Sequence, residues 1–242
     1  MWNGNMIDRI AKERLNIILM VDGSQSMAGK RIKQVNQAIL DIKDYLKELQ
    51  VENSNVDFYI TIITFQTDST FHANKECINI DDLVYDGIKC RGYSNLHLAY
   101  KKLGEILRKE SKGGIMPDFG GLAPIILLLT DGHPTGNQYK EELKLIENSP
   151  WFKASLRYGI AIELNDDRTM QVLNSFVGNN GDVISCYDAN MLKNIIKIIV
   201  LTASKVKSTS SNVICVEHDI TQHQEVKQLI AEKLADTENW EW

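Results

Sequence analysis

The feature that constrains this chain most is an apolar run at residues 17–21, which ends abruptly in Asp22-Gly23-Ser24-Gln25-Ser26-Met27. A continuous apolar run of this length before an Asp-Gly turn predicts a strand buried on both faces. Apolar residues then recur at helical spacing over residues 30–49. The polar turn therefore links a central strand to a helix, at the edge of the sheet where open α/β folds bind ligands.

Strands and helices alternate through the rest of the chain, and a second buried apolar run covers residues 123–130. This alternation predicts an α/β fold with a doubly wound, mostly parallel central sheet flanked by helices. The predicted strands cover residues 15–21, 57–65, 123–130, 155–163 and 182–186, with an edge hairpin at 70–73. The predicted helices cover residues 30–49, 96–107, 138–147, 166–177 and 189–204.

The composition changes after residue 207, where a short polar linker begins. We expect residues 1–207 to form one domain with an N-terminal arm, and residues 208–242 to form an appendage. The appendage carries an amphipathic pattern over residues 221–234 and an acidic end with Trp240 and Trp242. Its predicted helix could pack on its own domain or dock to a partner, and both interpretations remain open.

Charge and cysteine content exclude several classes of protein. The chain has 242 residues and a net charge of −5, so nucleic acid is not expected as the main partner. The four cysteines are scattered without a Cys-x-x-Cys pair, which favours free thiols in a reducing cytoplasm over a zinc or redox motif.

Residues 1–13 lack a signal-peptide core, and the apolar segment 195–201 is too short to span a bilayer. We therefore expect a cytoplasmic protein without a membrane partner.

The turn after the first strand has the chemistry of a metal site. Asp22, Ser24 and Ser26 alternate along the turn, so one carboxylate and two hydroxyls can converge on one point. These hard oxygen ligands suit Mg²⁺ or Mn²⁺ rather than Zn²⁺. The alternative is that Asp and Ser merely cap the following helix.

The turn resembles the metal-ion-dependent adhesion site of von Willebrand factor A domains. Two later segments strengthen the resemblance: residues 91–96 are similar to the family's Gly-x-Thr-x-Leu segment, and residues 125–135 are similar to its apolar strand ending in Thr/Ser-Asp-Gly. The resemblance covers about residues 15–204. Within the family, the chain is most similar to the bacterial TerY-like group, which is associated with tellurium resistance. Pro134 and Thr135 after the Asp-Gly pair, and the absence of a disulfide pattern, point to this group.

The resemblance implies a role for each residue of the site. Ser24, Ser26 and Ser94 would contact the metal, whereas Asp22 and Asp131 would hold its waters or coordinate it. We expect the two carboxylates to face each other, with no basic residue in either motif to neutralise them. The surrounding ligand surface would be formed by Tyr93, His97, His133 and Thr135.

The implied function is non-enzymatic protein binding. A cation with few anionic ligands remains under-neutralised and would attract an acidic side chain of a partner protein. The family's association with kinase and phosphatase partners, and with stress-resistance or phage-defence operons, implies an intracellular scaffold or regulator. Two alternatives remain: a metal-dependent phosphoester hydrolase, although no general base or second metal cluster is evident, and a client-recruiting subunit of an ATP-driven remodelling complex.

Overall fold

The computed structural model describes residues 12–52, 55–163, 166–179 and 181–209, together with residues 228 and 232. Its centre is a seven-stranded sheet with the order β3-β2-β1-β5-β6-β7, in which β4 also pairs with β2. Neighbouring strands among β2, β1, β5, β6 and β7 run parallel, whereas β3 and β4 pair antiparallel to β2. The predicted doubly wound, mostly parallel α/β fold is thus confirmed.

The strands lie close to the predicted ranges, except that the two-residue strand β4 was not predicted. They are β1 (Glu13–Asp22), β2 (Val56–Phe65), β3 (Ser69–Phe71), β4 (Ile78–Asn79), β5 (Ile125–Thr130), β6 (Leu156–Ile162) and β7 (Gly181–Cys186). Every residue of β5, and every residue of β1 after Arg14, is buried. This burial confirms that the two apolar runs form central strands covered on both faces.

The helices also follow the predicted periodicity, with one addition. They are α1 (Lys30–Glu52), α2 (Leu96–Ile106), α3 (Tyr139–Ile146), α4 (Pro150–Ala154), α5 (Asp167–Val177) and α6 (Ala189–Thr209). The short helix α4 lies between the predicted helix at 138–147 and the predicted strand at 155–163, and it was not among the predicted helices. Proline is in fact favoured in the first turn of a helix, where its missing N–H is not needed.

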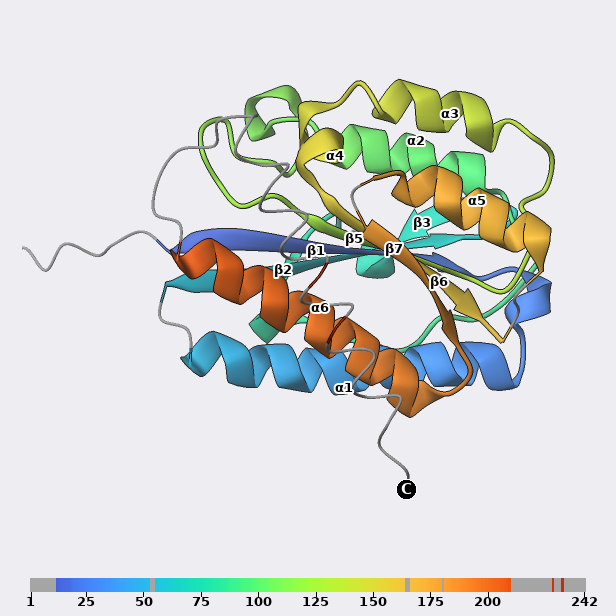
Figure 1. Ribbon diagram of the computed structural model, residues 1–242, viewed down its shortest axis with the longest axis horizontal. Helices are drawn as coiled ribbons and strands as arrows, with labels where there is room; N and C mark the ends of the chain where they lie inside the picture. The colour runs from blue at the N-terminus through green and yellow to red at the C-terminus, as the bar shows by residue number, and fades with distance from the viewer. Residues whose placement is uncertain are drawn as a thin grey trace, which may run out of the picture.

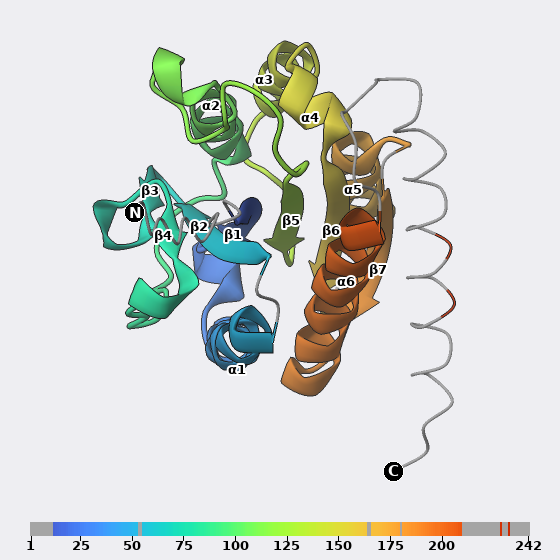
Figure 2. The same ribbon diagram turned by 90° about the vertical axis from the view of Figure 1, so that its left-hand side faces the viewer.

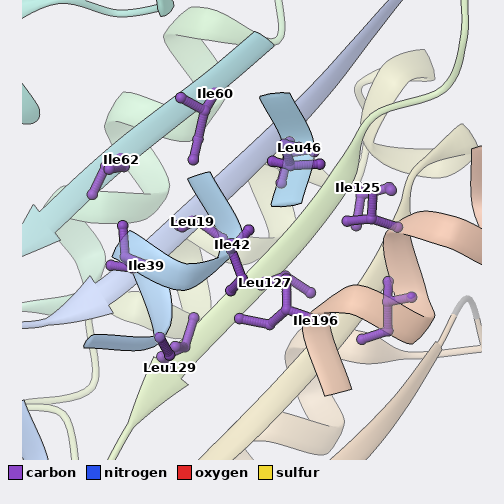
Figure 3. Close-up of a cluster of buried hydrophobic side chains, with 14 of the residues drawn as sticks. Leu19, Ile39, Ile42, Leu46, Ile60, Ile62, Ile125, Leu127, Leu129 and Ile196 are labelled. Atoms are coloured by element: carbon purple, nitrogen blue, oxygen red, sulfur yellow. The ribbon is translucent and has the colours of Figure 1, made fainter. Parts of the chain in front are cut away.

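Helices cover both faces of the sheet in a three-layer arrangement (Figures 1 and 2). Helices α1 and α6 lie side by side on one face, where Ile39, Ile42, Leu46 and Ile196 pack against strand residues such as Leu19 and Leu127 (Figure 3). Helices α2, α3, α4 and α5 cover the opposite face. The two apolar clusters fix the sheet rigidly, so residues at its edge are held at defined positions.

The chain reverses its winding direction at β1, which lies between β2 on one side and β5 on the other. The carboxyl ends of β1 and β5 therefore form the switch point at which open α/β sheets bind ligands. Their register pairs Val21 with Leu129, so Asp22 and Thr130 follow directly on adjacent strands. This places both predicted metal-binding motifs at the same point.

Most of the predicted appendage lies outside the described residues, as does most of the predicted N-terminal arm. Helix α6 continues to Thr209, past its predicted end at residue 204 and past the expected boundary at residue 207. In the predicted helix at 221–234, residues 228 and 232 are described as helical, and Gln228 donates a 3.2 Å hydrogen bond to Glu232. The two-part division of the chain stays a prediction.

Candidate metal centre

Asp22 ends β1 with a fully buried side chain whose two oxygens are both hydrogen-bonded. Oδ1 accepts from the backbone N–H of Ser24 at 2.9 Å. Oδ2 accepts from the hydroxyls of Ser94 at 2.9 Å and Thr130 at 2.7 Å. Burial raises the pKa of Asp22, and the hydrogen bonds oppose this effect by favouring the carboxylate. These donors fix the orientation of the carboxylate.

Ser24 and Ser26 connect the turn after β1 to Asp131, which follows β5. Their Oγ atoms lie 3.0 Å apart, and Ser26 Oγ donates to Asp131 Oδ1 at 2.8 Å. The Ser24 side chain forms no capping hydrogen bond to the short 3₁₀ helix Gln25–Met27, and α1 begins only at Lys30. The alternative interpretation of this turn as a helix cap is therefore not supported by the geometry.

Thr130 contacts the candidate site and was not among the site residues predicted from the sequence. Its hydroxyl is buried and donates to Asp22 from the neighbouring strand. The signal was available in the sequence, because Thr130 is the last residue of a buried apolar strand and immediately precedes Asp131. A polar side chain at that point must find a partner, and the nearest strand ends in Asp22.

Arg31, which lies outside both motifs, is a basic partner of Asp131 that the sequence motifs did not indicate. Its Nη1 atom donates to Asp131 Oδ2 at 2.5 Å and to the backbone carbonyl of Ser26 at 3.1 Å. Asp131 has no exposed side-chain surface in this pair, whereas Arg31 remains 31% exposed. Arg31 lies outside both motifs in sequence, but the first turn of α1 brings it over the end of β5.

A further carboxylate, Glu163, lies directly after β6 and was not predicted as part of the site. It accepts from Lys30 at 2.7 Å and from Gln34 at 3.2 Å, and it lies 3.5 Å from Arg31 Nε. The Lys30 hydrogen bond is the main cause that lowers the pKa of Glu163. Its backbone has a positive φ of 53°, which is uncommon for a residue other than glycine.

Main-chain hydrogen bonds hold the loops of the site together. Gly23 donates to the carbonyl of Phe65 on β2, and Arg91 donates to the carbonyl of Gly23. A Cβ atom at position 23 would lie 2.7 Å from Thr64 Cγ2, so only glycine fits against β2 here. The backbone N–H of Thr135 donates to the carbonyl of Ser94 at 2.7 Å. All three segments of the site are thus joined through their backbones.

The four residues of the predicted ligand surface differ in their exposure and in their contacts. Tyr93 is 68% exposed, and Thr135 is also exposed beside the Ser94 loop to which its backbone is bonded. His133 is exposed as well, but its Nε2 lies 2.7 Å from Asp166 Oδ1, and that carboxylate caps α5. His97 lies in the first turn of α2, and its buried Nδ1 has no hydrogen-bond partner among the described residues. No hydrogen bond or ion pair among the described residues joins His97 to Asp22, Ser94 or Asp131.

The described oxygen atoms fit a small, hard cation. Mg²⁺ binds oxygens at about 2.0–2.1 Å in an octahedron, which places adjacent ligand oxygens about 2.9 Å apart. The Ser24–Ser26 and Ser26–Asp131 separations of 3.0 and 2.8 Å are hydrogen-bond distances, and they are compatible with that spacing. No cluster of three or more His, Cys, Asp or Glu side chains occurs among the described residues. The oxygens at Asp22, Ser24, Ser26, Ser94 and Asp131 are therefore those of three hydroxyls and two carboxylates.

Comparison with known families identifies the class of protein. The model of the von Willebrand factor type A domain matches residues 16–199. This chain therefore belongs to the von Willebrand factor type A domain family, as its fold and the order of its three site segments indicate.

Related sequences cover only a part of much longer proteins. The chain is 29% identical over 144 residues to inter-alpha-trypsin inhibitor heavy chain H4 of Bos taurus. The matched segment covers 55% of this chain and 15% of that protein. It is 28% identical over 163 residues to the heavy chain H4 of Homo sapiens, covering 65% of this chain and 17% of that protein. The chain thus spans less than a fifth of the length of these relatives.

Solved structures share the fold at low sequence identity. A von Willebrand factor type A protein from Catenulispora acidiphila has a TM-score of 0.57 and 13% identity, over 80% of this chain and 43% of that chain. The pilus adhesin SpaC from Lactobacillus rhamnosus GG has a TM-score of 0.56 and 13% identity, over 80% of this chain and 30% of that chain. These similarities establish the architecture alone.

Among the described residues, no helix combines the length and apolar character that crossing a bilayer requires.

Proposed function

We propose that this chain is a non-enzymatic module that binds a partner protein through a divalent cation. The observation that carries this proposal is the convergence of five oxygen-bearing side chains from three separate segments at the switch point of the sheet. Hydrogen bonds of 2.8–3.0 Å join these side chains in two sets, one around Asp22 and one around Asp131. The residues are Asp22, Ser24, Ser26, Ser94 and Asp131.

The arrangement assigns different tasks to the hydroxyls and the carboxylates. Ser24, Ser26 and Ser94 would supply neutral oxygens to Mg²⁺ or Mn²⁺. Asp131 would orient the hydroxyl of Ser26, and Asp22 would orient the hydroxyl of Ser94. When bound, the cation would offer a coordination position to a carboxylate, because two partly shared anions leave it under-neutralised. The partner would therefore present an acidic side chain.

The surface around the site would determine which partner is accepted. Tyr93 offers a large exposed aromatic ring, a residue type that often anchors protein interfaces. Thr135 lies on the segment that is bonded to the Ser94 loop. His133 is held by Asp166, so it would present a fixed edge rather than a mobile ligand.

The wider role is inferred from the sequence resemblance to the TerY-like group. That resemblance rests on Pro134-Thr135 after the Asp-Gly pair, and it suggests a cytoplasmic scaffold in a bacterial stress-resistance or phage-defence system, with a kinase and phosphatase pair as partners. Cys77, Cys90 and Cys186 are free thiols, which is consistent with a reducing compartment. The inter-alpha-trypsin inhibitor heavy chains do not bear on this role, because they share one segment of their length with this chain.

The test is capture of a partner by the full chain. Tagged wild type and Ser26→Ala protein would be incubated with lysate of the native host, in Mg²⁺ and in EDTA. The proposal is supported by a protein that the wild type retains in Mg²⁺ but not in EDTA, and that soluble glutamate or EDTA releases. Equal retention by the variant, or in EDTA, contradicts it.

Absence of catalysis is tested separately. With Mn²⁺ or Mg²⁺, the purified protein should hydrolyse ATP and model phosphoesters no faster than an Asp22→Ala control. Metal-dependent turnover that is lost in that control would favour the hydrolase alternative over the binding module.

A further inference from the structure

Arg31 lies between two carboxylates that belong to adjacent strands. Its Nη1 pairs with Asp131 after β5, and its Nε lies 3.5 Å from Glu163 Oε2 after β6. Asp131 is buried, whereas Glu163 keeps 22% of its side-chain surface exposed. The guanidinium can therefore pair with either acid through a small change in its side-chain torsions.

Arg31 and a divalent cation need the same carboxylate. Asp131 has two oxygens, of which Oδ1 accepts from Ser26 and Oδ2 accepts from Arg31. A cation bound beside Ser26 would lie close to the guanidinium, and the two positive charges would repel each other in this largely buried place. Arg31 therefore opposes the binding of a cation as long as it remains on Asp131.

Glu163 provides an alternative partner for the displaced guanidinium. Its left-handed backbone, with φ of 53°, is a conformation that costs free energy in a residue with a side chain. The carboxylate is held there by Lys30 and Gln34 from α1, the same helix that carries Arg31. Glu163 is thus held close to the helix that carries Arg31. Arg31 can therefore leave Asp131 without losing an ionic partner.

We propose that Arg31 is an internal competitor of the divalent cation. It neutralises Asp131 when no cation is bound and pairs fully with Glu163 when one binds, so that the Arg31–Glu163 pair sets the metal affinity of the site. This inference rests on the metal site of the proposed function. It adds an affinity-determining pair that lies outside the motifs of the site.

The test is calorimetric titration of MgCl₂ into the metal-stripped full chain at fixed ionic strength. Arg31→Gln should bind Mg²⁺ about fivefold or more tightly than the wild type, in the range of typical coupling between sites. Lys33→Gln is the matched control, because Lys33 is an exposed residue of α1 with no ion pair among the described residues. It removes the same charge and should change the affinity less than twofold. Ser26→Ala removes a proposed ligand, so the heat of Mg²⁺ binding that is lost in this variant is assigned to this site.

Glu163→Gln separates the transfer of Arg31 from a general effect of charge. In the wild-type background this substitution should weaken Mg²⁺ binding, because the displaced Arg31 loses its second partner. In the Arg31→Gln background it should have a much smaller effect. A long-range charge effect alone would give equal losses in both backgrounds, and that result would overturn the proposal.

The remaining outcomes distinguish this inference from the proposed function. Equal, measurable Mg²⁺ affinity in the wild type, Arg31→Gln and Lys33→Gln would overturn the competitor role and leave the metal site intact. Absence of Mg²⁺ and Mn²⁺ binding in every variant would overturn the metal site, and the competitor role with it. Binding by Arg31→Gln alone would support the competitor role in its strongest form.

Discussion

Thr130 donates a 2.7 Å hydrogen bond to Asp22 Oδ2, although 108 residues separate the two in the chain. Both side chains are buried, with 3% and 0% of their surface exposed. The bond crosses from β5 to β1 at the carboxyl edge of the sheet. It holds in place the same Asp22 oxygen that also accepts from Ser94. Ser24 and Ser26 are hydrogen-bonded to each other, and Ser26 donates to Asp131.

Replacing Thr130 by valine should therefore affect both stability and metal binding. A hydrogen bond to a charged acceptor contributes about 1.5–3 kcal/mol, and the substitution preserves the shape of the side chain. We expect a loss of that size in urea denaturation and weaker Mg²⁺ binding by calorimetry. Thr61→Val is the control, because the buried Thr61 hydroxyl donates to the carbonyl of Glu76, away from the site. A similar loss of metal affinity in that control would contradict the orienting role of Thr130.

Divalent cations should raise the melting temperature. A ligand that binds only the folded state stabilises it by RT ln(1 + [L]/Kd), which is about 1.4–2.7 kcal/mol for ~10 mM Mg²⁺ and a Kd of about 0.1–1 mM. For a domain of this size the melting point should rise by about 3–10 °C. Ser26→Ala should lose most of the shift while keeping its fold, because Ser26 is exposed. Equal shifts in both proteins would mean that the cation binds elsewhere.

The pH dependence of stability should reveal the buried Asp22 carboxyl. Burial raises the pKa of Asp22 above its ordinary value of 3.8. The stabilising contribution of such a group is present below its unfolded-state pKa and is lost as pH rises through the folded-state pKa. In metal-stripped protein, wild type should therefore lose stability relative to Asp22→Asn as pH rises from about 4 toward neutrality. Mg²⁺ should reverse the trend, because it favours the carboxylate. Parallel pH profiles of urea denaturation would contradict this assignment.

Asp166 should contribute to stability without contributing to metal binding. It accepts from His133 and from the N–H groups of Arg168 and Thr169, and the His133 hydrogen bond is the main cause that lowers its pKa. Asp166→Ala should cost about 1 kcal/mol as a lost helix cap, whereas Asp166→Asn keeps the cap and should cost less. Because the pKa of Asp166 is lowered on folding, the contribution of the charged form should be fully present above about pH 4. It should be lost progressively as pH falls from there through the lowered pKa. Loss of the Mg²⁺ melting shift in Asp166→Ala would show that Asp166 belongs to the metal site.

Local patterns in the sequence predicted the strands and helices but not every partner of the site. The apolar runs before Asp22 and Asp131 determined the two central strands, because burial on both faces leaves a clear signal. Arg31 and Glu163 were missed because their relationship depends on how α1 crosses the ends of β5 and β6. Such contacts come from the packing of α1 and α6 on the sheet, which residue spacing does not encode.

The pairing of β1 with β5 also has a kinetic consequence. Ser26 and Asp131 are 105 residues apart, and they become neighbours only when the two central strands have paired. No short segment of the unfolded chain carries the complete set of oxygens. If the site closes after the transition state for folding, Mg²⁺ should slow unfolding and leave the folding rate nearly unchanged, which stopped-flow measurements in urea can test. The cation would then lengthen the lifetime of the folded chain rather than help the chain to fold.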